Sequence, residues 1–166
     1  MKALLIGLSL LVISTSSRAG EEADCVAAAG AYRTGVVVQG PRFAHGQFRK
    51  GIELSHTHLS LLADQDGKTY DVAIDNVFAA GFDPRVAAVP APINSIRLND
   101  KVEVCGALYT KGFGLHWVHV NCGGTPSASH PNGWLKLIDR NGGAGANLEG
   151  SVTYCSVFGA APAAEK

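Results

Sequence analysis

The stretch of sequence that decides the fold is Ile52-Glu-Leu-Ser-His-Thr-His-Leu-Ser-Leu-Leu-Ala63, followed by Asp64-Gln-Asp-Gly67 and Lys68-Thr-Tyr-Asp-Val-Ala-Ile-Asp-Asn-Val77. Apolar and polar side chains alternate along the last run, which is typical of a strand with one buried face. Asp66-Gly67, between two such runs, is a strong signal for a tight turn. The sequence therefore predicts a β-hairpin with strands at 52–63 and 68–77.

The rest of the chain contains further strand patterns and clear interruptions. Runs rich in β-forming residues occur at 32–38, 102–109, 114–122 and 151–158. Glycine and proline predict a loop at 40–51 and an irregular connection, with one helical turn, at 78–96. An alanine-rich segment with early acidic residues predicts a short helix at 21–29.

The order of these elements suggests an architecture. Three strands, an irregular connection and two strands are the succession found in a five-stranded oligonucleotide/oligosaccharide-binding (OB) barrel. The expected fold class is all-β: a small OB-like Greek-key barrel with a short N-terminal helix and an extra C-terminal strand at 151–158. An open antiparallel sheet or sandwich of six short strands is the alternative.

The first nineteen residues have the pattern of a cleaved export signal. Lys2 precedes an apolar run at 3–13, and the small residues Ser17 and Ala19 precede the expected cut. The run is shorter than the ~20 residues that a membrane-spanning helix needs. We therefore expect a periplasmic or secreted protein. Its predicted organisation is a signal peptide at 1–19, a single domain at 20–158 and a disordered tail at 159–166.

The charge balance limits the class of partner. Removing Lys2 and Arg18 with the signal leaves 12 of the 14 basic residues against 14 acidic ones, a net charge of about −2. Tight nonspecific binding to DNA or to an anionic membrane needs a strongly basic surface. The composition argues against both.

Four cysteines remain after cleavage, and an even number in an exported chain predicts two disulfides. The chain contains no Cys-x-x-Cys pair, so the spacing of the cysteines does not indicate a zinc site. The four residues allow three connectivities. Nearness along the chain favours the pairs Cys105–Cys122 and Cys25–Cys155.

Three motifs in the second half resemble those of a known family. They are Asn99-Asp-Lys-Val-Glu-Val-Cys-Gly-Ala-Leu-Tyr109, Gly114-Leu-His-Trp-Val-His119 and His130-Pro-Asn-Gly-Trp134. Together they resemble a family of small exported bacterial proteins of unknown function, which carry a Gly-x-x-His-Trp-Thr-His strand and a His-x-x-Gly-Trp turn. The chain departs from that pattern at Asn99, where the family has Gly, and at Val118, where it has Thr. The resemblance implies an OB-like barrel and export, and it implies no reaction.

Five histidines are candidate metal ligands. His56 and His58 are two apart and share one face of their strand, whereas His116 and His119 are three apart and would point to opposite faces of a regular strand. With His130 they could complete a zinc or copper site, the one cofactor that the sequence suggests. Structural histidines with hydrogen-bond partners at strand ends explain the same residues.

Aromatic and basic side chains mark two candidate binding surfaces. Trp117 and Trp134 could stack on a sugar or a base, or they could fill and cover the barrel; alternation with Leu115 favours a core position for Trp117. The second surface is a cluster in the loop expected at 40–51, and it consists of Arg42, Phe43, Phe48, Arg49 and Lys50. The loop after the first strand binds ligands in OB barrels, and this cluster suits phosphate or sulfate groups. A solvated loop whose phenylalanines pack on the barrel is the alternative.

These observations favour a non-catalytic exported binding or interaction protein, with an oligosaccharide, a single-stranded nucleic acid or a protein as its partner. Neither Gly-x-Ser-x-Gly nor Gly-x-x-x-x-Gly-Lys occurs in the chain. Asp71 and Asp75 share one face of their strand and loosely resemble the carboxylates of an OB-fold nuclease. The alternative function is a metal-binding protein or a metal-dependent hydrolase that uses the histidines.

Overall fold

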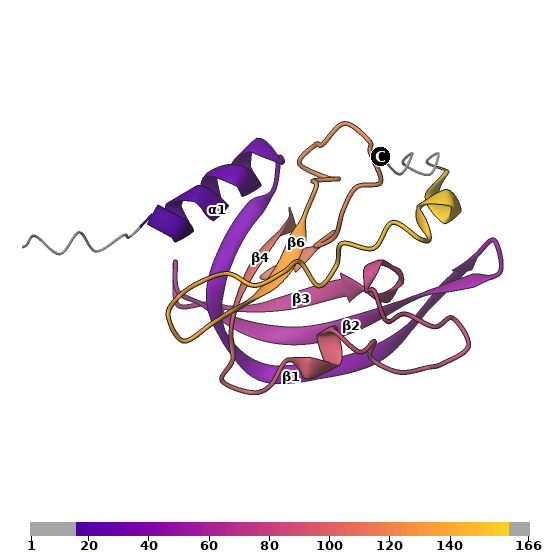
Figure 1. Cartoon of the computed structure of the whole chain (residues 1–166), viewed down its shortest axis with the longest axis horizontal. Coiled ribbons are helices and arrows are strands. Elements are labelled where there is room, and N and C mark those ends of the chain that lie inside the picture. The colour runs from indigo at the N-terminus through magenta and orange to yellow at the C-terminus, as the bar shows by residue number, and fades with distance from the viewer. Residues whose placement is uncertain (1–15, 160–166) are drawn as a thin grey trace, which may run out of the picture.

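Six strands form one sheet in the computed structural model of the chain, which describes residues 16–159 (Figure 1). The elements in chain order are α1 (Ser16–Ala27), β1 (Ala31–Arg49), β2 (Ile52–Ala63), β3 (Thr69–Asp75), the 3-10 turns η1 (Asn76–Phe78) and η2 (Ile93–Ser95), β4 (Lys101–Leu108), β5 (Gly114–His116), β6 (Trp134–Ile138) and the 3-10 turn η3 (Cys155–Phe158).

Five of the strands close into a ring. The order is β1–β2–β3–β5–β4, and β4 pairs back onto β1. Neighbouring strands are antiparallel except β3 and β5, which are parallel. The sixth strand, β6, pairs with β4. This arrangement confirms the predicted all-β, OB-like barrel with an N-terminal helix and an additional late strand.

The prediction of a loop at 40–51 is wrong, because β1 continues to Arg49 as one long, curved strand. Its pairing with β2 shifts register between Val37 and Gln39, between Gln39 and Arg42, and between Ala44 and Gln47. Such β-bulges bend a strand, and here they take up the glycines and the proline that suggested a loop. The close approach of the two strands also requires glycine at position 46, since a Cβ there would lie 1.6 Å from the carbonyl oxygen of Leu54.

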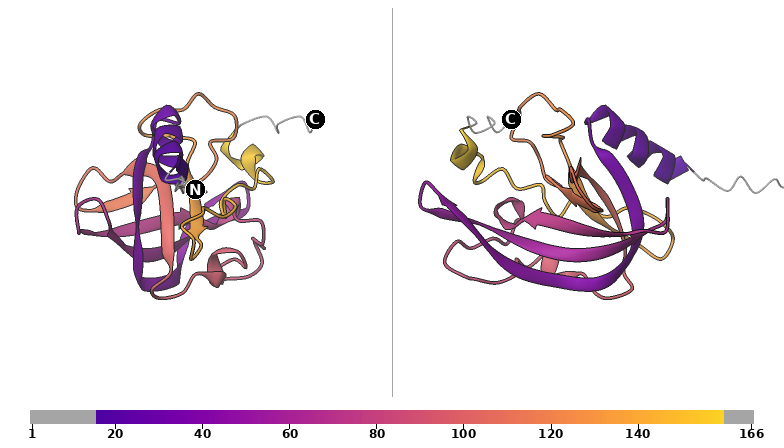
Figure 2. Two further views of the ribbon diagram at one scale, coloured as in Figure 1. Left: turned by 60° about the vertical axis from the view of Figure 1, so that its left-hand side comes forward. Right: turned by 180° about the vertical axis from the view of Figure 1, so that it is seen from behind.

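The predicted hairpin is confirmed, with β2 at the expected bounds and β3 slightly shorter. Leu59, Leu61, Val72 and Ile74 point into the main core and are fully buried. The alternate positions face outward, and they include most of the polar residues of the two strands. The β1–β2 hairpin also extends past the end of β3, as the views in Figures 1 and 2 agree, because residues 52–55 pair with β1 alone.

The expected strand at 151–158 is also wrong. This segment forms a turn that leads into η3, and the extra strand is β6 instead. The β-forming residues of the segment do not pair with the sheet, because Cys155 is fixed by a disulfide to the chain after β5.

Both predicted disulfides are present, but the favoured pairing is wrong. The bonds are Cys25–Cys105 and Cys122–Cys155. Cys105 pairs in register with Tyr32 at the start of β1, which follows α1 directly. The sheet therefore brings Cys105 to the helix that carries Cys25, although the two are 80 residues apart.

Two disulfides are typical of proteins that fold in an oxidising compartment. Most of the predicted signal peptide (1–15) and of the predicted tail (160–166) lies outside the described residues, whereas residues 16–19 form the first turn of α1. Between residues 16 and 159, no helix has the length and apolar character needed to cross a membrane.

Candidate functional site

The outer face of the β2–β3 hairpin carries a row of titratable side chains. In the register of the hairpin, His56 lies directly opposite Asp75. His58 is two residues further along β2, on the same face, and its Nδ1 lies 3.0 Å from both carboxylate oxygens of Asp71. The hydroxyl of Tyr109 also donates to Asp71, over 2.8 Å. Each carboxylate on this face thus has a histidine beside it.

The carboxylate of Asp75 lies between two imidazoles. Nε2 of His56 is 2.8 Å from Oδ1, and Nε2 of His119 is 3.1 Å from Oδ2. Burial alone would raise the pKa of Asp75, but its contacts with His119 and His56 outweigh burial and hold the pKa well below its usual value. The contact with Asp75 in turn raises the pKa of His56, against the opposing effect of burial. Asp75 is therefore ionised at neutral pH.

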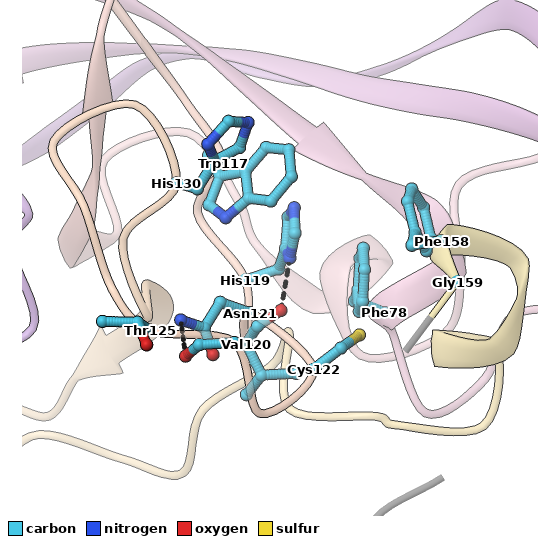
Figure 3. Close-up of a pocket in the computed structure, with 11 residues that line it drawn as sticks. Phe78, Trp117, His119, Val120, Asn121, Cys122, Thr125, His130, Phe158 and Gly159 are labelled. Atoms are coloured by element: carbon cyan, nitrogen blue, oxygen red, sulfur yellow. Dashed lines mark hydrogen bonds between the residues drawn. The ribbon is translucent and has the colours of Figure 1, made fainter. Parts of the chain in front are cut away.

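His119 is held in one orientation. Its ring is 1 % exposed and stacks on Phe78, with ring centroids 3.7 Å apart and planes 5° apart. Nδ1 lies 2.7 Å from the carbonyl oxygen of Val120, which can only accept, so Nδ1 carries a proton (Figure 3). Nε2 contacts Asp75 but is not aligned with any hydrogen-bond partner in the structure. The side chain is fixed, yet its inner nitrogen is incompletely satisfied.

A backbone turn at Trp117 separates His116 from His119, and the turn brings His119 to the carboxylate of Asp75. β5 ends at His116, and Trp117 adopts a left-handed φ of 55°, which is rare for a bulky residue. The alternation of a strand stops there, since Val118 and His119 are both buried. The expectation that His116 and His119 face apart assumed a regular strand, whereas the strand ends at His116; His116 is exposed and His119 is buried. Trp117 itself is half-buried and lines pockets instead of filling the core.

Two adjoining pockets meet at Trp117 and Phe158. The first, which we call the His130 pocket, has a volume of about 410 Å³ and also contains Phe78 and His119 in its wall (Figure 3). Trp117 is in contact with two rings there: the centroid of His130 lies 4.4 Å away, edge to face, and that of His119 lies 4.7 Å away. The pocket is thus enclosed by aromatic and imidazole rings.

The second, which we call the His56 pocket, has a volume of about 520 Å³ on the outer face of β2 and β3. Its polar lining is His45, Gln47, His56, Asp75 and His116. Five of the six histidines of the chain therefore line one pocket or the other. Such a concentration of planar polar groups beside aromatic walls is typical of a binding site.

A third hollow continues the line of pockets. It is about 450 Å³ in volume, is lined by Tyr109, Thr110 and Lys111 in the β4–β5 connection, and shares His116 with the His56 pocket. We call the three adjoining pockets together the Trp117 track. Partial desolvation lowers the pKa of His116 in the middle of this track, and the nearby His119 and His130 add to that effect against the charge of Asp75. His116 is therefore a neutral imidazole at neutral pH.

A fully buried carboxyl group lies behind the track. Glu149 is 0 % exposed, and neither of its side-chain oxygens has a hydrogen-bond partner in the structure. Burial raises the pKa of Glu149 well above its usual value, and the charge of Asp75 adds to this. The backbone around it is ordered, because the Val120 amide donates to the Glu149 carbonyl over 3.3 Å. Unpartnered buried groups of this kind are rare in native proteins.

A buried polar network fixes the turn that follows Asp75. The hydroxyl of Thr57 donates to the Asn76 side-chain oxygen over 2.6 Å, and the Asn76 amide donates to Ser55 over 3.1 Å. Ser55 and Thr57 lie on the inner face of the hairpin, Asn76 begins η1, and all three are buried. The network holds η1 in place, and η1 supplies Phe78 to the His130 pocket.

The other predicted site residues do not line the track. His58 pairs with Asp71, and Trp134 packs with Cys25, Tyr32 and Cys105 in a separate cluster. None of the basic cluster lines the three pockets, the cluster being Arg42, Phe43, Phe48, Arg49 and Lys50. These residues lie along the second half of β1 and its turn.

Sequence reasoning missed two parts of the site. The pairing of His56 with Asp75 was within its reach, because a hairpin centred on residues 65 and 66 sets them opposite each other. Phe158 and Glu149 were not, since Phe158 was assigned to a strand that does not form and Glu149 belonged to no motif. Only the fold brings these two residues to the site.

No group of three or more His, Cys, Asp or Glu side chains within residues 16–159 is arranged to hold a metal ion. His56 and His119 both contact Asp75, but their Nε2 atoms lie against different oxygens of its carboxylate. The zinc or copper site stays a prediction.

Comparison of the chain with protein-family models, with curated proteins and with solved structures found no significant match. The resemblance to the exported family therefore stays a prediction as well. The interpretation of the site rests on its own geometry and chemistry.

Proposed function

We propose that this chain is an exported, non-catalytic binding protein, periplasmic or secreted, whose ligand lies in the Trp117 track. The observation that carries the proposal is the continuity of the track: neighbouring pockets share Trp117, Phe158 and His116. The His56 pocket lies on the outer face of β2 and β3, the face that OB barrels use for ligands. The export pattern at residues 1–19 and the two disulfides support the location.

The chemistry of the track favours binding over catalysis. Asp75 is a weak general base, because its pKa is held low and both of its oxygens contact imidazoles. The surrounding groups, such as Gln47 and His116, are suited to fix the orientation of a ligand. The unusual backbone of Trp117 supports a functional role, since strained residues cluster at ligand sites.

The test is a fragment screen monitored by backbone amide chemical shifts of the isotope-labelled protein. Binding fragments should shift the amides of residues that line the track, above all those near Trp117 and His116. Ala73→Leu should reduce these shifts, because Ala73 lies in the wall of the His56 pocket and a larger side chain would fill it. Shifts confined to other surfaces, or no binding fragment at all, would contradict the proposal.

Metal binding is the second candidate function. It is favoured by one observation: Nδ1 of His119 donates to a backbone carbonyl, an arrangement common among metal-ligating histidines. Elemental analysis of protein purified without a His-tag decides this alternative. Stoichiometric zinc or copper would support it, and a fully folded, metal-free protein would count strongly against it.

A further inference from the structure

We infer that the ligand of the Trp117 track is a neutral oligosaccharide. This inference rests on the proposed function and names its class of ligand. It is carried by three properties of the track: its length, its lack of net charge and the kind of polar groups along it.

The length of the track suits a chain-like ligand. The three pockets have volumes of about 410, 520 and 450 Å³, and each shares at least one lining residue with the next. A single pocket of this size already matches a typical small-molecule site. A ligand that follows all three must be a short oligomer, with successive units beside His130, Asp75 and Tyr109.

The charge of the track disfavours a polyanion. Lys111 is the one lysine or arginine among the residues that line the three pockets. Nucleic acids need several such cations to neutralise their phosphates. The carboxylate of Asp75 lies in the middle of the track, where it would repel an anionic ligand, and because each of its oxygens already contacts an imidazole it is not free to bind a cation. A neutral ligand fits this balance.

The polar groups of the track match hydroxyl groups, which both donate and accept hydrogen bonds. The side-chain amide of Gln47 can both donate and accept, and it makes no hydrogen bond within residues 16–159. The neutral imidazole of His116 likewise has one donor and one acceptor nitrogen, and neither is used in the described structure. The rings of Trp117 and Phe158 supply apolar walls for the C–H surfaces of a sugar.

The two tryptophans make a direct experiment available. Trp134 packs in the cluster around the Cys25–Cys105 disulfide, outside the track, so a Trp134→Phe variant leaves Trp117 as the sole tryptophan. Its fluorescence is titrated with cellotetraose, maltotetraose and chitotetraose, with the corresponding monosaccharides, and with single-stranded oligothymidylate. Isothermal titration of the unmodified protein gives the same affinities if Trp134→Phe does not fold.

At least one neutral tetrasaccharide should change the emission of Trp117 and bind about tenfold more tightly than its monosaccharide, because it fills more of the track. Its affinity should be nearly independent of salt. Gln47→Ala should weaken binding by about fivefold, the loss of one or two hydrogen bonds. The matched control is Gln39→Ala on the same strand, which lies outside the track and should leave the affinity unchanged.

Three results would overturn the inference. They are binding of oligothymidylate alone, equal affinity for monosaccharide and tetrasaccharide, and no response of Trp117 to any neutral glycan. If fragments still bind in the track by chemical-shift mapping, the class of ligand is wrong and the proposed function stands. If mapping also finds nothing in the track, both fail.

Discussion

Two buried glutamates lie in regions of the molecule that are built differently. Glu103, on β4, is 1 % exposed, accepts a 2.9 Å hydrogen bond from the Tyr32 hydroxyl and lies 3.4 Å from Nζ of Lys136. Glu149, behind the track, is 0 % exposed, and its side chain has no hydrogen-bond partner among residues 16–159. Burial raises the pKa of both carboxyl groups. Only the first one is compensated by a cation and a donor.

The surroundings of the two glutamates differ in the same way. Near Glu103, the Cys25–Cys105 disulfide packs against Tyr32 and Trp134 in a closed cluster, which we call the α1 region. Near Glu149, the aromatic rings and the Cys122–Cys155 disulfide border open pockets. The same residue types serve stability in one place and enclose a cavity in the other. Buried side-chain atoms without an aligned hydrogen-bond partner occur on both sides, but Glu149, on the side with the cavity, is the carboxyl group in which both oxygens lack one among residues 16–159.

The largest expected effect separates the two disulfides. In the chain-entropy description, closing a loop of 80 residues contributes about 4.5 kcal/mol and closing one of 33 residues about 3.7 kcal/mol. Removing the Cys25–Cys105 bond by a double Ser substitution should therefore lower the free energy of unfolding more than removing Cys122–Cys155. Urea unfolding of both variants measures the difference.

Ligand binding should rank the same two variants in the opposite order. Cys122 lines the His130 pocket, and the bond to Cys155 fixes η3 with Phe158. Loss of this disulfide should weaken tetrasaccharide binding more than loss of Cys25–Cys105, when both are measured below their melting temperatures. Equal losses of binding would contradict the division into two regions.

Gly133 lies between the two regions, and a side chain there should disturb both. A Cβ would lie 2.4 Å from the carbonyl oxygen of Cys105 and 2.5 Å from that of Trp117. Since both neighbours are backbone atoms, Gly133→Ala should cost about 2–3 kcal/mol of stability and alter the emission of Trp117. Gly124→Ala is the control, because its Cβ would meet only the Asn121 oxygen at an ordinary 3.5 Å. Similar stabilities for the two variants would refute the expected clash.

Local patterns predicted the fold where neighbours along the chain are also neighbours in the sheet. The β2–β3 hairpin is such a case, and its turn lies at the predicted Asp64-Gln-Asp-Gly67 segment. The pairing of the cysteines is the opposite case, because Cys105 meets Cys25 through the register of β4 with Tyr32. Glycine and proline at 40–51 led to the wrong prediction of a loop, since these residues occur at β-bulges as well as in loops.

The candidate site was predicted in part, for related reasons. Histidine and tryptophan are conspicuous in any sequence, so His56, His116, His119 and Trp117 were singled out. Their true relation depends on the left-handed φ of Trp117, which no local pattern announces. The strand expected at 151–158 had suitable composition, but a disulfide and the pocket fix that segment instead.

Substituting the unpaired glutamate should affect stability in a pH-dependent way. Because folding raises the pKa of Glu149, its contribution to stability is complete below the ordinary value of 4.5 and is lost as the pH rises through the folded value. Glu149→Gln cannot ionise, so its stability relative to the unmodified protein should increase with pH. At neutral pH we expect a gain on the order of 1 kcal/mol, at the lower end of the cost of an unpartnered buried polar group.

Urea unfolding between pH 4 and pH 8 measures this difference, and Glu103→Gln is the matched control. Glu103 is paired, so its replacement weakens the contact with Lys136 and should yield no comparable gain at neutral pH. If the two glutamine variants behave alike, the contrast between the α1 region and the track is not electrostatic.

The smallest effect is expected from the basic cluster on β1. The Lys50 ammonium donates to the Ser156 carbonyl over 2.7 Å, and the Arg49 guanidinium lies 5.6 Å from the ring centroid of Phe158. Both contacts are at the surface, so Arg49→Ala with Lys50→Ala should change the free energy of unfolding by less than about 1 kcal/mol. Tetrasaccharide affinity should fall by no more than about twofold, from a slightly looser Phe158.

Arg42→Ala completes this test, because Arg42 lies opposite His58 on the sheet and outside the track. If the cluster rather than the track is the binding surface, the triple alanine variant should abolish oligothymidylate binding at low salt and flatten its salt dependence, while Gln47→Ala changes nothing. Our proposal expects the reverse: Gln47→Ala weakens binding of the neutral glycan, and the triple variant leaves that binding nearly intact. The two sets of variants therefore assign the ligand to one surface, because Gln47 lines the track and the three cationic side chains do not.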